Sequence, residues 1–225
     1  MRTYPMFVSL EGRHCLVVGA GQVGLRKIAS LLDCGAAGLT VIEPAAPSQA
    51  LRELAARPGV TLLRRDFESG DLDGVFLAIA ATSDPDQNLR IGALCRQRGI
   101  FCNIVDSPEL GSFLVPSSVQ RGDLTIAIST GGRSPALAKR IRKDLQERFG
   151  EEYAGFLKLM GRLRPMLLAL GRPSEENAAI FRRLAGSRLL EALRADDGAL
   201  ARSELTALLP AELHYRITEL LDGAA

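Results

Sequence analysis

Six consecutive residues near the N-terminus have the spacing of a phosphate-binding glycine turn: Gly19-Ala20-Gly21-Gln22-Val23-Gly24. In such a turn the first glycine permits a tight bend, the second lets the backbone approach a pyrophosphate, and the third lets a helix pack closely on a strand. An apolar run precedes the turn and helically spaced leucines follow it, so the required strand and helix are present. The pattern predicts a dinucleotide site contacted by Gly19, Gly21, Gln22, Val23 and Gly24.

Glu43 ends the next apolar run, residues 39–42, about twenty residues after the turn. A carboxylate at this place can accept hydrogen bonds from ribose hydroxyls and repel a 2′-phosphate, which favours NAD over NADP. A solvated carboxylate at the end of a strand is the simpler alternative. Arg26 and Lys27 could also offset the charge of a phosphate.

Two more apolar runs end in residues that could do chemistry. Ala81 and Thr82 follow residues 75–80 and are predicted cofactor contacts, with an ordinary strand-to-turn position as the alternative for Thr82. Asp106 directly follows residues 101–105, so its carboxylate is expected over the same sheet edge as the cofactor. There it could serve as a general base, and from spacing alone a turn or helix-cap role is equally consistent.

These residues need a parallel sheet to bring them together. Strands alternate with helices across residues 13–106, which predicts βαβ units and a Rossmann-type, doubly wound α/β fold. Afterwards the alternation stops: strands are expected at 114–116 and 124–129, then a helix capped by Ser134, and short amphipathic helices from residue 151. The predicted domains are 1–112 (dinucleotide-binding), 113–150 (mixed middle segment) and 151–225 (small helical domain).

The helix that begins after Ser134 carries the one marked basic patch of the sequence. Six cations lie in or beside it, against two acids: Arg133, Lys139, Arg140, Arg142, Lys143 and Arg148, against Asp144 and Glu147. A solvated helix face is the default interpretation. The functional alternative is a site for a ligand with several carboxylates, since clustered Arg and Lys bind such groups well.

Composition sets the outer bounds. The chain has 225 residues, 47% of them apolar and 24% charged, with 28 Lys and Arg against 26 Asp and Glu. This balance gives no general attraction to nucleic acid or membranes. The four cysteines form no metal-ligand pattern and are expected to be reduced, and no signal peptide or membrane span is expected. These features predict a soluble, cytoplasmic protein without a resident metal.

Four motifs in fixed order resemble one known family. Together with the opening Pro5-Met6-Phe7, they are similar to the precorrin-2 dehydrogenase/sirohydrochlorin ferrochelatase module of siroheme synthases. The motifs are the run from Cys15 through the glycine turn to Ala29, Leu77-Ala78-Ile79-Ala80-Ala81-Thr82, Phe101-Cys102-Asn103-Ile104-Val105-Asp106, and Ile128-Ser129-Thr130-Gly131-Gly132-Arg133-Ser134-Pro135. The resemblance is good up to about residue 150 and loose beyond it.

The resemblance implies NAD as cofactor, Asp106 as the family's essential aspartate, and an opening strand at residues 5–7. It also implies a homodimer whose middle segment helps to bind a tetrapyrrole. The family's Ser-Ser-Gly-Gly-x-Ser-Pro motif has Thr130 at its second position here, which keeps the hydroxyl and adds a methyl group. The predicted substrate contacts are Asn103, Thr130, Gly131, Gly132, Arg133, Ser134, Lys139 and Arg140.

Three functions are compatible with these features. The first is NAD-dependent oxidation of precorrin-2 to sirohydrochlorin. The second is a bifunctional enzyme that also inserts Fe²⁺ or Co²⁺ into sirohydrochlorin, and the third is a non-catalytic NAD-binding regulatory module. The methyltransferase domain of fused siroheme synthases is not expected in 225 residues, so precorrin-2 would come from a separate enzyme.

Overall fold

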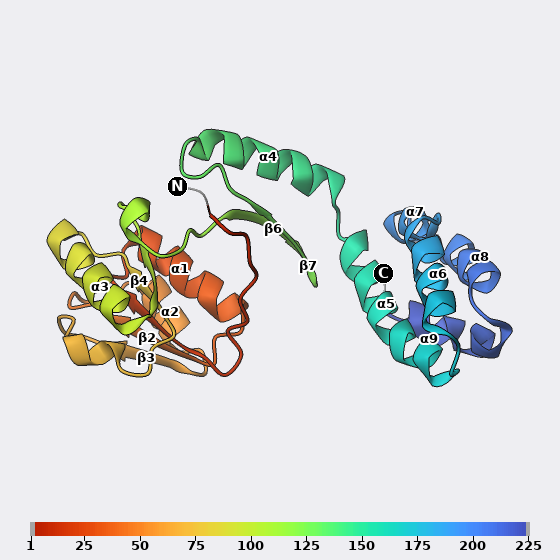
Figure 1. Ribbon diagram of the computed structural model, residues 1–225, viewed down its shortest axis with the longest axis horizontal. Helices are drawn as coiled ribbons and strands as arrows, with labels where there is room; N and C mark the ends of the chain where they lie inside the picture. The colour runs from red at the N-terminus through yellow and green to blue at the C-terminus, as the bar shows by residue number, and fades with distance from the viewer. Residues whose placement is uncertain (1–2, 224–225) are drawn as a thin grey trace. The chain divides into compact units, whose positions relative to one another are not determined.

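A computed structural model describes residues 3–223 of the chain. By its internal contacts the chain divides into two compact units, Met1–Val115 and Pro116–Ala225. In Figure 1 the first unit runs from red to yellow-green and the second from green to blue. The finer division of the second unit near residue 150 stays a prediction.

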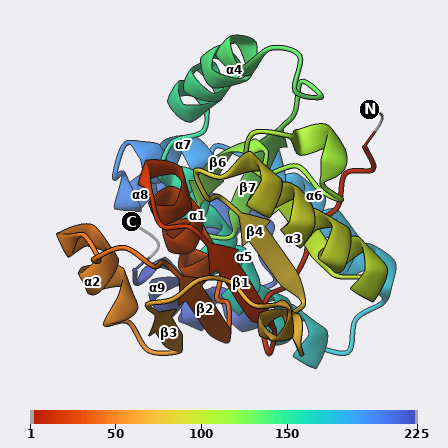
Figure 2. The ribbon, with the colours of Figure 1, turned by 90° about the vertical axis from the view of Figure 1, so that its left-hand side faces the viewer.

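The first unit is built on a five-stranded parallel sheet, as predicted. The strand order is β3-β2-β1-β4-β5, so the chain reverses its direction of winding between β3 and β4. Figure 2 shows β3, β2, β1 and β4 in this order. The strands are β1 (His14–Val18), β2 (Gly38–Ile42), β3 (Val60–Leu63), β4 (Leu77–Ala80) and β5 (Phe101–Ile104). β1 and β4 are almost wholly buried, as apolar strands covered on both faces must be. The doubly wound α/β fold is confirmed.

Helices connect these strands and cover the sheet. They are α1 (Gln22–Asp33), α2 (Gln49–Ala55), α3 (Pro85–Arg98) and the short 3₁₀ helices η1 (Ser69–Leu72) and η2 (Pro108–Leu110). Asp84 caps α3 by accepting hydrogen bonds from the N–H groups of Asp86 and Gln87, and Gly99 ends the helix in the left-handed conformation, φ 69°.

Two predicted strands are wrong. Residues 114–116 form no strand, because the chain before them is tied to β5 by a side-chain bond from Asn103 Nδ2 to the carbonyl of Phe113, 3.1 Å, and Pro116 has no N–H for a ladder. Residues 5–7 also form no strand in this structure, and all residues from 3 to 9 are exposed. β4 begins two residues later than predicted, since Val75 N closes a turn onto the carbonyl of Leu72.

The second unit opens with an antiparallel hairpin and one long helix. β6 (Ser117–Arg121) pairs with β7 (Leu124–Ile128) through the turn at Gly122, and α4 (Pro135–Arg148) packs on the hairpin. The predicted helix start is confirmed: Ser134 Oγ accepts from the N–H of Leu137, 3.3 Å, and Pro135 occupies the first helical position. Within residues 116–149, only Val119 and Ala138 are buried apolar residues.

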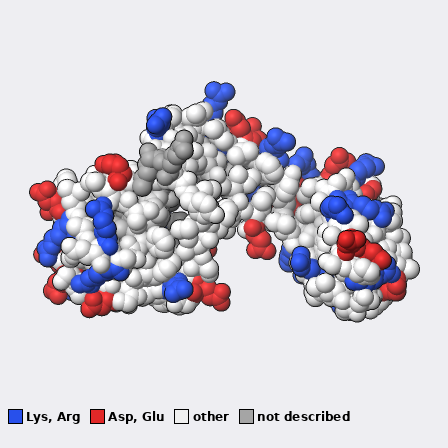
Figure 3. Space-filling view, viewed as in Figure 1, with Lys and Arg blue, Asp and Glu red and all other residues white. Residues whose placement is uncertain are grey.

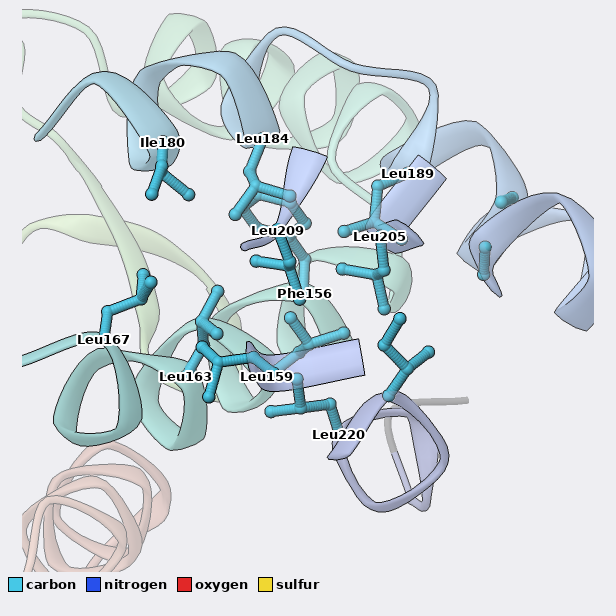
Figure 4. Packing of buried hydrophobic residues seen from close by; sticks show 14 residues of the cluster. Phe156, Leu159, Leu163, Leu167, Ile180, Leu184, Leu189, Leu205, Leu209 and Leu220 are labelled. Atoms are coloured by element: carbon cyan, nitrogen blue, oxygen red, sulfur yellow. The ribbon is translucent and has the colours of Figure 1, made fainter. Parts of the chain in front are cut away.

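Five helices and a 3₁₀ helix complete the second unit around a core of their own. They are α5 (Glu152–Ala169), α6 (Ser174–Ala185), α7 (Leu189–Arg194), α8 (Gly198–Leu208), η3 (Ala211–Arg216) and α9 (Ile217–Leu221). Phe156, Leu159, Leu163 and Leu167 recur every three or four residues along α5 and point into this core (Figure 4). The predicted helical C-terminal region is confirmed.

Replacing Leu163 with alanine should destabilise this helical core by about 2–5 kcal/mol, because the side chain is fully buried and its removal leaves a cavity. Hydrogen exchange of the amides of α5 to α9 measures the loss. The matched control is Leu168→Ala on the same helix, whose side chain is 59% exposed and should cost less than about 0.5 kcal/mol. Equal effects of the two changes would contradict this account of the core.

Charged side chains of both signs are interspersed over the face shown in Figure 3, in agreement with the near balance of acids and bases. Across residues 3–223, no helix combines the length and the hydropathy needed to cross a bilayer.

Candidate functional site

A cleft of about 400 Å³ lies at the carboxyl edge of the parallel sheet. Every strand of the sheet contributes to it through its last residues or the loop that follows. The lining residues are Val18, Gly19, Gly21, Gln22, Val23, Ile42, Glu43, Pro44, Asp66, Phe67, Ala81, Thr82, Ser83, Asp84, Gln87, Val105 and Asp106. A ligand at the edge where the strand order reverses is the expected arrangement for this fold.

The glycine turn has the close contacts that its spacing predicts. Gly19 adopts φ 92°, a conformation that L side chains rarely enter, and a Cβ there would collide with the backbone of Ala81. A Cβ on Gly24 would collide with the carbonyl oxygen of Gly19. A Cβ on Gly21, in contrast, would meet no protein atom within 4 Å. Gly19 and Gly24 therefore close the turn, and Gly21 leaves room for a ligand.

The N-terminus of α1 adds free hydrogen-bond donors to this room. The first helical bond runs from Leu25 N to Gly21 O, 2.9 Å, so the N–H groups of residues 22–24 lie ahead of the helical ladder. Gly21 has no side chain to cap them, and the first turn holds no acidic residue. These donors and the positive end of the helix dipole suit a phosphate, so the residues present fit a dinucleotide.

Glu43 is fixed in place by two backbone donors. Its carboxylate accepts a hydrogen bond from Ala20 N at 2.8 Å and another from Ala45 N at 3.0 Å. The carboxylate therefore stays beside the glycine turn, where a ribose hydroxyl can reach its remaining lone pairs. Arg26 and Lys27 are not among the lining residues of the cleft.

Thr82 lines the cleft, but its hydroxyl is bonded to Asn88, a residue that the sequence did not suggest. Buried Asn88 accepts hydrogen bonds from Thr82 N at 3.1 Å and Thr82 Oγ1 at 2.8 Å, and its amide donates to Thr82 O at 3.0 Å. These three bonds hold the loop after β4 against the first turn of α3. No sequence pattern marks an asparagine inside a helix for such a role.

Asp106 lies in the turn after β5, exposed and lining the cleft. The helix-cap alternative is not what the structure shows: Ser107 precedes the 3₁₀ helix η2, and no side chain caps it. The carboxylate therefore shares one cleft with the glycine turn and Glu43, and all predicted cofactor contacts except Gly24, which packs behind the turn, line that cleft.

The structure adds cleft residues that the sequence did not suggest. Pro44, Asp66, Phe67, Ser83, Asp84 and Gln87 line it beside the predicted ones. Asp66 and Phe67 come soon after β3 (Val60–Leu63), and the ends of parallel strands meet at one edge. Neither residue directly follows its apolar run, so the rule that located Glu43 and Asp106 did not single them out.

The predicted substrate residues lie elsewhere. Asn103 is buried within β5, where its side chain bonds to Phe113, and it does not line the cleft. The other seven lie in the second unit. Thr130 and Ser134 brace the turn before α4, because Ser134 N donates to Thr130 Oγ1 at 3.3 Å. Lys139 and Arg140 are exposed on α4.

Metal ligands do not gather in the part of the chain that the structure describes. No three His, Cys, Asp or Glu side chains of residues 3–223 lie together as a candidate metal site. The four cysteines are free thiols, with Cys15, Cys95 and Cys102 buried and Cys34 exposed. Burial raises the pKa of the Cys15 thiol to about 11.

Two family models match the chain in sequence order. A model described as putative NAD(P)-binding matches residues 6–117, and one described as sirohaem biosynthesis protein central matches residues 121–148. The first match covers the whole cleft, so the first unit is an NAD(P)-binding domain. The second covers β6, β7 and α4.

Relatives of known name match nearly the whole chain. The siroheme synthase of Thioalkalivibrio sulfidiphilus is 37% identical over 216 residues, which are 96% of this chain and 44% of that protein. The siroheme synthase of Enterobacter sp. (strain 638) is 34% identical over 221 residues, which are 98% of this chain and 48% of that protein. The chain thus spans less than half the length of these relatives.

A solved structure matches over almost its full length. It is that of SirC, a precorrin-2 dehydrogenase, with a TM-score of 0.70 and 28% identity, covering 92% of this chain and 98% of SirC. The predicted resemblance is confirmed. With both segments matched in order, the chain belongs to the siroheme synthase family and comprises its NAD(P)-binding and central segments.

Proposed function

We propose that this chain is an NAD-dependent precorrin-2 dehydrogenase, which oxidises precorrin-2 to sirohydrochlorin in siroheme biosynthesis. The observation that carries the proposal is the Asp106 carboxylate, which lines the same cleft as the glycine turn. A base and a dinucleotide site in one cleft are what a dehydrogenation needs. The named function of SirC supports the same reaction.

Each part of the cleft has a distinct role in this proposal. Gly21 and the N–H groups at the start of α1 hold the pyrophosphate, and Glu43 holds the adenosine ribose. When bound, NAD supplies the chemistry of accepting a hydride. Asp106 orients the macrocycle by accepting a hydrogen bond from it and takes the one proton that the substrate loses together with one hydride. The hydrogen bonds between Thr82 and Asn88 hold the loop after β4 on α3, with Thr82 lining the cleft.

The second unit supplies the cations that the substrate requires. Precorrin-2 carries several carboxylates, and the exposed Lys139 and Arg140 form no ion pair within residues 3–223. We assign these two, together with the turn from Thr130 to Ser134, to carboxylate binding. Asn103 acts indirectly, by fixing the chain at Phe113.

We also propose a homodimer that forms through residues 116–149. This part buries only Val119 and Ala138, and a two-stranded hairpin is marginally stable by itself. A second copy packed on it would bury the half-exposed apolar residues of β7. Static light scattering tests this: a mass of one chain would contradict it.

The decisive test is an anaerobic assay with purified protein, precorrin-2 and NAD. The visible spectrum should change to that of sirohydrochlorin while the near-ultraviolet absorbance of NADH rises in step. Bound NAD without turnover would contradict the proposal and favour a regulatory module. Adding Co²⁺ or Fe²⁺ to the finished reaction shows whether the same protein also inserts metal, which stays a prediction.

Glu43 should select NAD against NADP, because its fixed carboxylate repels a 2′-phosphate. Glu43→Gln removes the charge and should narrow the preference for NAD by about tenfold or more, measured as the ratio of the two dissociation constants. The control is Glu53→Gln, an exposed change on α2 outside the cleft. An unchanged ratio in Glu43→Gln would show that Glu43 does not face the ribose.

A further inference from the structure

The loops that line the cleft follow the order of the strands. Across the sheet, Asp66 follows β3, Glu43 follows β2, the glycine turn follows β1, and Asp106 follows β5 at the other edge. The pyrophosphate belongs at the glycine turn and the adenosine ribose at Glu43. Continuing in the same direction, the next group of the cofactor is the adenine ring, and the next loop is the one that carries Asp66.

The loop after β3 is held in a fixed conformation. Phe67 is buried, with 5% of its surface exposed, and anchors the loop in the core below the sheet. Arg65 donates two hydrogen bonds to Asp71, at 2.9 and 2.5 Å, and a third to the carbonyl oxygen of Asp66. The side-chain bond from Arg65 lowers the pKa of Asp71, which keeps this pair ionised.

This arrangement leaves the Asp66 carboxylate available. Its neighbour Arg65 turns to Asp71, and Asp66 forms no ion pair in the described part of the chain. The other carboxylates of the cleft are committed or remote: Glu43 binds two backbone N–H groups, Asp84 caps α3, and Asp106 lies beyond β4. Asp66 is therefore the free acceptor at the adenosine end.

We infer that Asp66 accepts a hydrogen bond from the exocyclic amino group of adenine, and so makes this site select a dinucleotide with a 6-aminopurine. The inference rests on the NAD site of the proposed function. A carboxylate can only accept hydrogen bonds, so it matches an amino group and repels a carbonyl oxygen at the same place. A site built around an N–H group strongly rejects the analogue that lacks it.

The test compares NAD with nicotinamide hypoxanthine dinucleotide, in which a carbonyl oxygen replaces the amino group. Titration calorimetry of the full chain gives both dissociation constants without any tetrapyrrole. The wild-type protein should prefer NAD by about tenfold or more, because the hydrogen bond has a charged acceptor. Asp66→Asn should abolish or reverse the preference, since the new amide can donate to the carbonyl oxygen.

Two further variants separate a specific contact from a general loss of charge. Asp66→Ala should bring the ratio of the two dissociation constants near one, without a preference for the hypoxanthine dinucleotide. Asp86→Asn, an exposed change outside the cleft, should keep the wild-type ratio. Equal binding of both dinucleotides by the wild-type protein, or an unchanged ratio in Asp66→Asn, overturns the adenine contact alone. Failure of the wild-type protein to bind either dinucleotide overturns the cofactor assignment and the contact together.

Discussion

Asp106→Asn should lower the rate of precorrin-2 oxidation by about 10²–10⁴-fold, because an amide of the same size cannot take a proton in the transition state. The measurement is NADH formation under anaerobic conditions with both substrates saturating. NAD affinity should change little, since Asp106 follows β5 and the pyrophosphate and ribose contacts lie over β1 and β2. A fall in rate with intact cofactor binding separates a proton-transfer role from a folding defect.

The matched control for Asp106→Asn is Asp84→Asn. Both aspartates are exposed and line the same cleft, so both changes remove one negative charge from it. Asp84 caps α3, and asparagine is an equally good cap, so the helix should be kept. The Asp84→Asn variant should therefore oxidise precorrin-2 at close to the wild-type rate. A near-normal rate in Asp106→Asn, or equal losses in the two variants, would remove the general-base assignment.

The cleft was largely predictable because parallel strands bring their carboxyl ends to one edge. Glu43 and Asp106 are far apart in the sequence, yet each directly follows an apolar run, and that position alone puts both beside the glycine turn. Asn88 and Asp66 could not be found in this way. The role of Asn88 depends on three hydrogen bonds to Thr82, six residues earlier, which no sequence pattern marks, and Asp66 comes after two arginines that follow a short, half-buried strand.

The two wrong strands have a common physical cause. Residues 114–116 resemble a strand in composition, and the family resemblance implied one at 5–7, but a strand also needs N–H groups that face a partner. Pro5 and Pro116 lack that group. The segment after β5 is held to that strand by side chains instead of by a backbone ladder: Ser112 Oγ accepts a hydrogen bond from Cys102 N at 2.8 Å. Local composition cannot show which backbone groups find partners.

Gly21→Ala should leave the fold intact and remove most of the affinity for NAD. Gly21 has φ −64° and ψ −174°, which alanine adopts without strain, and the added methyl group meets no protein atom within 4 Å. The methyl group instead takes space that the pyrophosphate needs. Overpacking of this kind costs about 1–3 kcal/mol, a roughly ten- to hundredfold weaker dissociation constant. Calorimetric titration with NAD and a thermal unfolding curve measure the two properties separately.

Gly24→Ala is the informative contrast, because the same methyl group three positions later in the motif should have the opposite effect. Its Cβ would collide with the carbonyl oxygen of Gly19, so the turn or α1 must shift and the unfolding temperature should fall. The two variants therefore divide the motif into a glycine that binds and a glycine that packs. Normal NAD affinity in Gly21→Ala would mean that no phosphate approaches the turn, and unchanged stability in Gly24→Ala would mean that helix and strand are not in close contact there.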